Sequence, residues 1–338
     1  MSLDKIEEAF YLYLEGIQLL QGALKTSFLD AYIETIENII DGYQVRVVDG
    51  VPNEQSVDNL NDNYQKIKQI SLNAEEKRKL SQLLLLKGMQ SEPIQPNHQL
   101  TPDSIGFLFV FLIEQLYPNK SETYTILDLT AGMGNLLLTI LTNLRLNDYQ
   151  LKGIGVDNDE TLLAICAANS QWIGEEVTLY HQDSLQDLLV DPCDVVFGDL
   201  PIGYYPMDDN AKQFITGVDS GHSFAHHLLL EQSMAYVKEN SFGLFLVPSN
   251  FLETDQSDQL KKWLSGEEIF LQGIIQLPTE LFKNEATQKS ILLLQRQGEK
   301  AKQVPQVLLA KLETLKDPKA VVAFFNEFKQ WQKESGLI

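Results

Sequence analysis

Glycines and acidic residues with a spacing suited to ligand binding lie in the middle of the chain. The stretch ILDLTAGMGNL at 126–136 is an apolar run that ends in Asp128 and is followed by Gly132 and Gly134. Glycines let the backbone turn tightly and approach a ligand, and the amides that open a following helix can donate hydrogen bonds to it. A glycine turn also occurs for steric reasons alone, so this pattern is not specific by itself.

An acidic residue after the next apolar run makes the pattern more specific. Asp157 ends the run GIGVD, 25 positions after Gly132. A carboxylate at the end of the second strand of such a unit can accept both hydroxyls of a ribose. The pattern therefore predicts a nucleoside-bearing cofactor.

Two features favour S-adenosyl-L-methionine over a dinucleotide. The third glycine of a dinucleotide fingerprint would fall at position 137, which is Leu137. The carboxylate of Asp128 would repel a diphosphate but attract an ammonium or sulfonium group. We therefore expect S-adenosylmethionine as the cofactor. The residues expected to bind it are Thr101, Asp128, Thr130, Ala131, Gly132, Gly134, Asn135, Asp157, Asn158, Asp183 and Ser184.

Asp183 and Thr101 each have a structural alternative to this role. Asp183 follows a third apolar run, where its carboxylate could accept the exocyclic amine of adenine or could cap a helix beginning there. Thr101 could cap a helix with Pro102 in its first turn, and such a turn could also close over a cofactor.

Short β-rich runs alternate with helical runs through this part of the chain. Two helices are expected between the early strands, at 135–144 and 161–173. The predicted strands are 124–129, 151–157, 176–181, 194–199, 242–248, 271–277 and 290–295. Strands that alternate with helices of this length indicate a parallel sheet covered on both faces. The strand at 290–295 follows a short connection and could run antiparallel as an inserted strand.

The first 95 residues have helical patterns instead. Apolar residues at three- and four-residue spacing through 3–40 predict two antiparallel helices. Residues 49–63 are rich in turn formers, and a further helix is expected from Ala74 to Leu86, ending at Gly88. Two prolines make 91–97 an extended connector.

We therefore expect three parts. They are an N-terminal helical domain at 1–95, a cofactor-binding domain at 96–300 and a strand and helix extension at 301–338, whose helix from Ala320 to Trp331 docks on the core.

Composition excludes several classes of protein. With 44% hydrophobic residues, 16 Phe and 12 Tyr in 338 residues, the chain has enough apolar material for a core, which excludes wholesale disorder. The longest apolar run, Phe107 to Ile113, is far shorter than the ~20 residues of a membrane span, so we expect a cytoplasmic protein. Cys166 and Cys193 are too few for a disulfide scaffold and are expected to be reduced and buried.

The net charge of −21 is concentrated in the middle of the chain. Residues 121–210 have two basic and fifteen acidic side chains. A DNA-binding protein usually presents a basic stripe, so lysines from elsewhere would have to contact phosphates. Lysines are frequent after residue 250, where we expect them on a solvated face.

Three histidines also cluster, at His222, His226 and His227. A pair spaced i, i+4 could bind zinc, but a third ligand of matching spacing does not stand near it in the sequence. We expect these histidines to pack in the core or to make structural hydrogen bonds rather than to bind a metal.

Motifs at seven places resemble one known family, in the same order along the chain. They are QLTP at 99–102, the aspartate and glycines at 128–134, Asp157, FAHH at 224–227, LVPSN at 246–250, LPTELF at 277–282 and KSIL at 289–292. Together they resemble the S-adenosylmethionine-dependent methyltransferases of amino groups, most closely the YtxK-like group and the modification subunits of type I restriction systems. The resemblance covers roughly residues 97–297 and implies an α/β fold with a doubly wound, Rossmann-like sheet.

The catalytic signature of this family is altered here. Where the family has NPPY, NPPF or DPPY, this chain has DLPI at 199–202. In the family, the first side chain and the next carbonyl accept the two hydrogens of a planar amino group, and the aromatic ring stacks on the base. The resemblance implies the acceptor roles for Asp199 and Leu200, with Pro201 holding the turn.

The aromatic position of the signature is Ile202, which cannot stack on a base in the same way. Tyr204 or Tyr205 could supply the ring if the loop folds back. The catalytic residues that we expect are Asp199, Leu200, Pro201 and Tyr204.

Two classes of function follow. The first is an enzyme that methylates an amino nitrogen, with N6 of adenine in DNA as the default substrate and with protein glutamine or RNA as alternatives. The second is a cofactor-binding module with altered catalysis that acts through partners. Ile202 and the acidic middle favour the module, whereas Asp199, Pro201 and the cofactor motifs favour the enzyme. In either case the N-terminal helices could dock a protein partner or form a homodimer.

Overall fold

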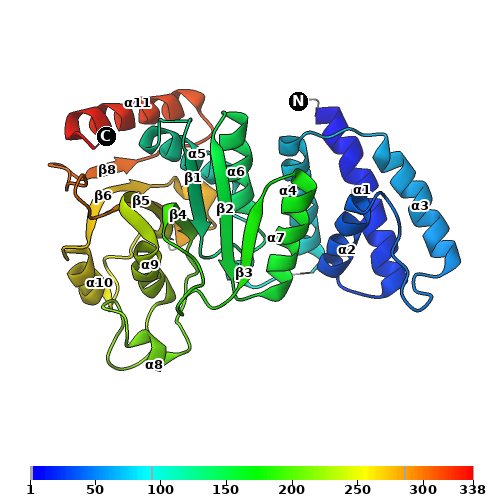
Figure 1. Ribbon diagram of the computed structural model, residues 1–338, viewed down its shortest axis with the longest axis horizontal. Coiled ribbons are helices and arrows are strands. Elements are labelled where there is room, and N and C mark those ends of the chain that lie inside the picture. Colours follow the sequence, from blue (N-terminus) through cyan, green and yellow to red (C-terminus); the bar gives the residue numbers. More distant parts are fainter. Residues whose placement is uncertain (1–2, 93, 285–286, 338) are drawn as a thin grey trace.

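A single eight-stranded sheet forms the centre of the molecule (Figure 1). The computed structural model describes residues 3–92, 94–284 and 287–337. The strands are β1 (Thr123–Asp128), β2 (Gln150–Asp157), β3 (Val177–His181), β4 (Cys193–Asp199), β5 (Val237–Pro248), β6 (Ile269–Gln276), β7 (Lys289–Arg296) and β8 (Leu308–Lys311). Their order across the sheet is β3-β2-β1-β4-β5-β7-β6-β8.

The direction of the strands sets the edge at which a site can form. Neighbouring strands are parallel, except that β7 is antiparallel to both β5 and β6. This confirms the inserted orientation considered for 290–295. The carboxyl ends of the parallel strands and the amino end of β7 therefore meet at one edge, where ligands bind in doubly wound sheets.

Helices cover both faces of this sheet, which confirms the predicted α/β class. On one face, α5 (Asp103–Leu116), α6 (Asn135–Leu146) and α11 (Pro318–Ser335) share a core with side chains such as Phe197 and Leu244. On the other face, α9 (Ala225–Ala235) and α10 (Ser257–Leu264) pack on Val196 and Phe245. Central strands buried on both sides read as continuous apolar runs, which is the pattern seen in the sequence.

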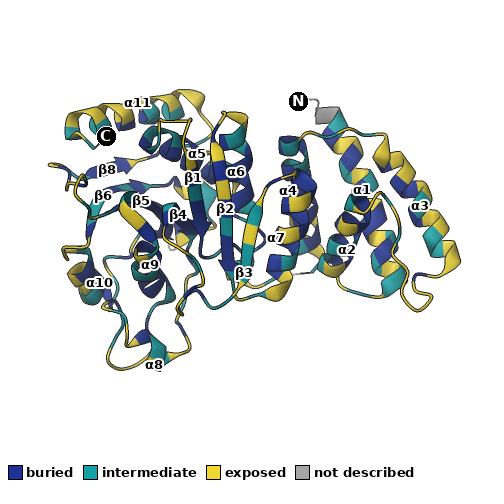
Figure 2. Ribbon diagram, viewed as in Figure 1, coloured by how far each residue is buried: buried dark blue, intermediate teal, exposed yellow. Residues whose placement is uncertain are grey.

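Four N-terminal helices pack beside the sheet at the β3 end (Figure 1). They are α1 (Leu3–Leu24), α2 (Phe28–Ile40), α3 (Glu54–Lys68) and α4 (Ala74–Ser91), and they share an apolar core with α7 (Glu160–Ile173). Figure 2 shows the buried residues of these helices on the sides that face one another. The hydroxyl of Tyr32 in α2 donates to Oδ1 of Asn169 in α7 at 2.5 Å.

Two expectations for this part were wrong. Residues 49–63 were expected as turn, but α3 begins at Glu54, because Asn53 caps it and the buried Leu60, Tyr64 and Ile67 follow at helical spacing. The helix predicted from Ala74, which is α4, does not end at Gly88 but continues to Ser91. A Cβ at Gly88 would lie 2.2 Å from the Phe28 ring, so this glycine is needed for close helix packing.

The connector between the helices and the sheet is short. Residue 93 of the predicted connector 91–97 lies outside the described residues, and Pro96–His98 forms a single 3₁₀ turn.

The C-terminal segment extends and covers the sheet. β8 pairs in parallel with β6, and the Phe325 ring of α11 stacks on Phe111 of α5 with ring centroids 3.7 Å apart. The helix expected from Ala320 to Trp331 is therefore present. The remaining short elements are α8 (Asp208–Ala211) and a 3₁₀ turn at Thr279–Leu281. Among the helices described, none is both long and apolar enough to span a bilayer.

Candidate active site

A cavity of about 480 Å³ lies at the ligand-binding edge of the sheet, above β1 and β4. It is within the size range of small-molecule sites. Its walls come from the segment before α5, the glycine turn after β1, the loop after β4 and the residues around the start of β7. Of the residues predicted from the sequence, the cavity brings together Thr101, Asp128, Thr130, Ala131, Gly132, Asn135, Asp199, Leu200 and Pro201.

The two glycines of the turn after β1 have different tasks. Both have a positive φ, +50° at Gly132 and +81° at Gly134, so both favour glycine. A Cβ on Gly132 would meet no atom within 4 Å, whereas a Cβ on Gly134 would lie 2.4 Å from Sγ of Cys166. Gly132 therefore leaves open space in the cavity wall, while Gly134 allows α6 to pack on α7.

Asp128 is a buried carboxyl group in the floor of the cavity, with 1% of its surface exposed. Its Oδ1 accepts a hydrogen bond from the amide of Thr130 at 2.9 Å. Burial raises the pKa of Asp128 to about 7, with a further contribution from the charges of Asp157 and Asp199. Because a cation in the cavity would stabilise the carboxylate, this group is suited to a positively charged ligand.

Asp157 holds the glycine turn in place. Its Oδ2 accepts from the Gly132 amide at 2.8 Å, and its Oδ1 accepts from the Asp159 amide at 3.0 Å. Burial raises the pKa of this group as well. Asp157 is thus joined to the cavity wall through Gly132. The next residue, Asn158, accepts from His181 through its backbone carbonyl.

Asp183 and Ser184 lie beside this turn and make internal hydrogen bonds. Ser184 Oγ donates to the Leu129 carbonyl at 2.5 Å. The Asp183 carboxylate accepts from the Leu185 amide at 3.0 Å and from the Tyr205 hydroxyl at 2.6 Å. The alternative that Asp183 caps a helix is wrong, since the carboxylate caps a turn and β4 is the next element. Its contact with adenine stays a prediction.

Thr101 connects the segment before α5 to the end of β4. Its Oγ1 donates to Asp199 Oδ2 at 2.8 Å, and its carbonyl accepts from Asn135 Nδ2 at 2.6 Å. The alternative that Thr101 caps the helix is wrong, because α5 begins at Asp103 without a side-chain cap. The hydroxyl is used by Asp199 instead.

The start of α5 is fixed by a buried arginine of the N-terminal helices. Arg78 donates to both carboxylate oxygens of Asp103 at 2.9 Å and to both oxygens of Glu75. It also donates to Thr139 Oγ1 in α6. Arg78 therefore links three helices behind the cavity. The sequence analysis did not identify it because Asp103 and Thr139, its partners on the other two helices, lie 25 and 61 positions away.

Lys289 is the other residue that the sequence analysis missed as part of the site. It begins β7, and its ammonium group forms an ion pair with Asp199 Oδ1. The same Nζ lies 3.4 Å from the carbonyl oxygen of Leu200. The motif KSIL pointed to a strand, but local sequence carries no signal that its first side chain reaches β4.

The aromatic residues of the loop after β4 lie elsewhere. The Tyr204 ring stacks on Phe224 with centroids 4.8 Å apart, and 58% of Tyr204 is exposed. Tyr205 is buried against Asp183. Ile202 lies at the rim of the cavity, where Asn97 bonds to both its amide and its carbonyl. The structure does not bring Tyr204 into the cavity, and its catalytic role stays a prediction.

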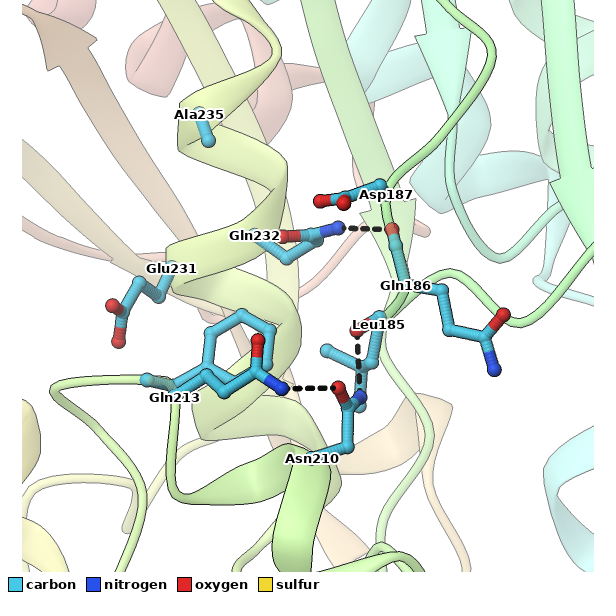
Figure 3. A pocket seen from close by; sticks show the side chains of 9 residues that line it. Leu185, Gln186, Asp187, Asn210, Gln213, Glu231, Gln232 and Ala235 are labelled. Carbon is cyan, nitrogen blue, oxygen red and sulfur yellow. Dashed lines mark hydrogen bonds between the residues drawn. The ribbon is translucent and has the colours of Figure 1, made fainter.

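A second cavity, of about 540 Å³, lies between α8, α9 and the loop after β3 (Figure 3). Its wall contains none of the predicted site residues. Asn210 donates to the Leu185 carbonyl and Gln232 to the Gln186 carbonyl, as Figure 3 shows. The Glu231 carboxylate accepts from two backbone amides. These polar groups hold the loops together and do not converge on a ligand.

The histidines lie on α9 and the loop before it. Burial lowers the pKa of His226 to about 3 and that of His227 to about 4, so both are neutral. His222 is at the surface and pairs with Asp208. Within the described ranges, no three His, Cys, Asp or Glu side chains gather as a metal site.

Comparisons with known proteins agree with this architecture. The family described as N-6 DNA Methylase matches residues 96–328, and the YtxK N-terminal helical domain matches residues 7–89. YtxK of Bacillus subtilis (strain 168), itself uncharacterized, is 36% identical over 336 residues, 99% of each chain.

Solved structures extend the comparison. A candidate class I S-adenosylmethionine-dependent methyltransferase from Listeria monocytogenes is 38% identical with a TM-score of 0.89, covering 98% of this chain and 99% of that one. The methyltransferase subunit of a type I restriction-modification system from Streptococcus thermophilus shares the fold, with a TM-score of 0.64 and 14% identity over 94% of this chain and 74% of that one. The resemblance drawn from the motifs is thereby confirmed, and the chain belongs to the N-6 DNA methylase family.

Proposed function

We propose that this protein is an S-adenosylmethionine-dependent methyltransferase that acts on an amino nitrogen, most specifically on N6 of adenine in DNA. The observation that carries the proposal is that one cavity is lined both by a buried carboxyl group, Asp128, and by two oxygen atoms suited to accept an amino group, Asp199 Oδ1 and the Leu200 carbonyl oxygen. The family to which the chain belongs supports the same reaction class.

The residues present fit the proposed cofactor. S-adenosylmethionine supplies a methyl group activated by a sulfonium. A bound cation would favour the carboxylate form of Asp128, which would attract it in turn, and Gly132 leaves room for a ligand to touch the backbone. Asp157 holds the turn through the Gly132 amide. We propose that the other predicted cofactor residues contact S-adenosylmethionine from the segment before α5, the glycine turn and the loops after β2 and β3.

The acceptor side of the cavity fits a planar amino group. The Asp199 carboxylate and the Leu200 carbonyl would accept its two hydrogens and draw its lone pair away from the ring. Methyl transfer leaves a surplus proton on the nitrogen, for which Asp199 is the adjacent acceptor. Pro201 fixes the turn, so positioning supplies most of the acceleration.

The proposed nucleic-acid substrate needs cations near the cavity. Lys283 and Lys289 line its wall, although the β1 to β4 region is acidic. One of the solved structures with this fold is a type ISP restriction-modification enzyme bound to DNA. At 12% identity, the likeness shows a shared fold only. A cytoplasmic location and a partner or second copy on the N-terminal helices remain part of the proposal.

A methyl-transfer assay tests the proposal directly. The protein is incubated with tritiated S-adenosylmethionine and one possible acceptor at a time. The acceptors are adenine-containing DNA, RNA and cell protein. We expect label in DNA, released as N6-methyladenine on digestion, and none with Asp199→Ala. Calorimetric titration with the cofactor tests the shared premise, and the absence of binding would overturn the proposal. Binding without label in any acceptor would favour the non-catalytic module.

A further inference from the structure

One side chain of the protein occupies the place proposed for the target amino group. Lys289 Nζ contacts Asp199 Oδ1 and lies 3.4 Å from the Leu200 carbonyl, which are the two acceptors named above. Resting on the proposed function, we infer that Lys289 fills the acceptor position and that a target amine must displace it before methyl transfer. Lys289 then sets how much the target amino group contributes to binding.

Both carboxylate oxygens of Asp199 already accept a donor in this arrangement. While Lys289 pairs with Oδ1 of Asp199, Thr101 Oγ1 donates to Oδ2 at 2.8 Å. The side chains of Asp199 and Lys289 are 24% and 18% exposed, so water screens the pair only partly. A second donor cannot reach Asp199 Oδ1 in its place without moving the ammonium.

The backbone of Lys289 cannot retreat to make room. Lys289 pairs with Pro248 of β5, and its neighbour Ser290 pairs with both Val247 of β5 and Gln276 of β6. The strand therefore fixes the Cα, and only the flexible side chain can leave the acceptors.

The charge of the pair decides what the lysine does. An ammonium has no lone pair, so Lys289 does not itself accept a methyl group while the ion pair lasts. A neutral amino group that replaces it forms hydrogen bonds of lower strength with Asp199 than the ammonium did. The lysine therefore competes with the target amine and offsets the binding free energy that the amino group would otherwise add.

The test compares two single-stranded oligodeoxynucleotides that differ by one amino group. One contains a single adenine, and the other contains purine at that position. Binding is measured by calorimetry for the wild type, Lys289→Met, Lys289→Arg and Lys238→Met. Lys238 forms a Lys–Asp pair with Asp194 at the opposite end of β4, which makes its variant a matched control.

The readout is the ratio of the two affinities, because loss of a cation weakens both strands alike. We expect a ratio below about threefold for the wild type, Lys289→Arg and Lys238→Met. For Lys289→Met we expect the ratio to rise at least tenfold, the order of one charge-assisted hydrogen bond. Lys289→Ala replaces the Met variant if that variant does not fold.

Three results would overturn the inference. They are an unchanged ratio in Lys289→Met, a high wild-type ratio that falls in Lys289→Met and returns in Lys289→Arg, and a mass increase of one methyl on Lys289 after incubation with cofactor. Cofactor titration of the same proteins separates this inference from the proposed function. Failure of the wild type to bind cofactor refutes the function, whereas normal binding with an unchanged ratio refutes only the inference.

Discussion

At the scale of single residues, the buried carboxyl group of Asp128 should make binding of the proposed cofactor depend on pH. Its pKa of about 7 in the free protein falls when a cation binds, so binding releases a proton. We expect the affinity for S-adenosylmethionine to rise about tenfold from pH 6 to pH 8 and then to level off. Calorimetry in buffers of different ionisation enthalpy measures both the affinity and the number of protons released on binding.

The variant Asp128→Asn is the control, and it should bind more weakly without this pH dependence. An equally steep rise in this variant would contradict the role of Asp128. In the free protein the same raised pKa lowers stability as pH rises from about 4, the ordinary value, to about 7, because the folded chain holds a proton that the unfolded chain loses.

The two glycines of the turn allow a second comparison. Gly134→Ala should reduce the free energy of unfolding by about 2–4 kcal/mol, because the new Cβ meets Cys166 and the positive φ is strained. Gly132→Ala should cost only about 1 kcal/mol, since space is open there. Its cofactor affinity should nevertheless fall more than tenfold. Denaturation and titration of both variants measure these effects, and equal loss of stability would contradict the assignment.

At the scale of elements, the buried Arg78 should be a large contributor to stability. Arg78→Ala leaves Glu75 and Asp103 without their partner behind the cavity, which should cost about 3–5 kcal/mol. Lys5→Ala removes a partly exposed ion pair between α1 and Glu76, which lies on α4 like Arg78. This change should cost less than about 1 kcal/mol. Urea denaturation measures the free energy of unfolding of the two variants. Similar decreases would contradict the large contribution assigned to Arg78.

The elements themselves were largely predictable because their patterns are local. Strands β1 to β4, β6 and β7 lie within two residues of the predicted bounds, since buried strands read as apolar runs. The start of β5 at Val237 was missed, because its first residues include the exposed, polar Lys238 and Glu239. Helix α3 was missed because its solvent face is rich in Asn and Asp.

The site was predictable only where it follows the ends of strands. Asp128, Gly132 and Asp199 could be identified because the fold brings strand ends together. Lys289 and Arg78 could not, since their partners come from distant elements. The domain boundary at 95/96 stays a prediction.

At the scale of the whole molecule, the N-terminal helices share an apolar core with α7, which lies between β2 and β3 in the chain. Leu162, Ile165 and Trp172 of α7 pack against the N-terminal helices. We expect a chain that begins at residue 92 to expose these side chains and to aggregate. The full chain should unfold in one calorimetric transition. A soluble, cooperatively folding fragment would show instead that the two parts are independent.

The reversed direction of β7 has a consequence for the speed of substrate entry. Hydrogen bonds on both of its sides hold the backbone at Lys289, so exposing Asp199 requires only rotation about the lysine's own side-chain bonds. Such rotations take picoseconds to nanoseconds for exposed side chains; breaking the partly buried ion pair slows this one, but no hinge or lid has to move. Rapid-mixing experiments with an acceptor strand should therefore show a single, concentration-dependent phase, without a slow isomerisation after encounter.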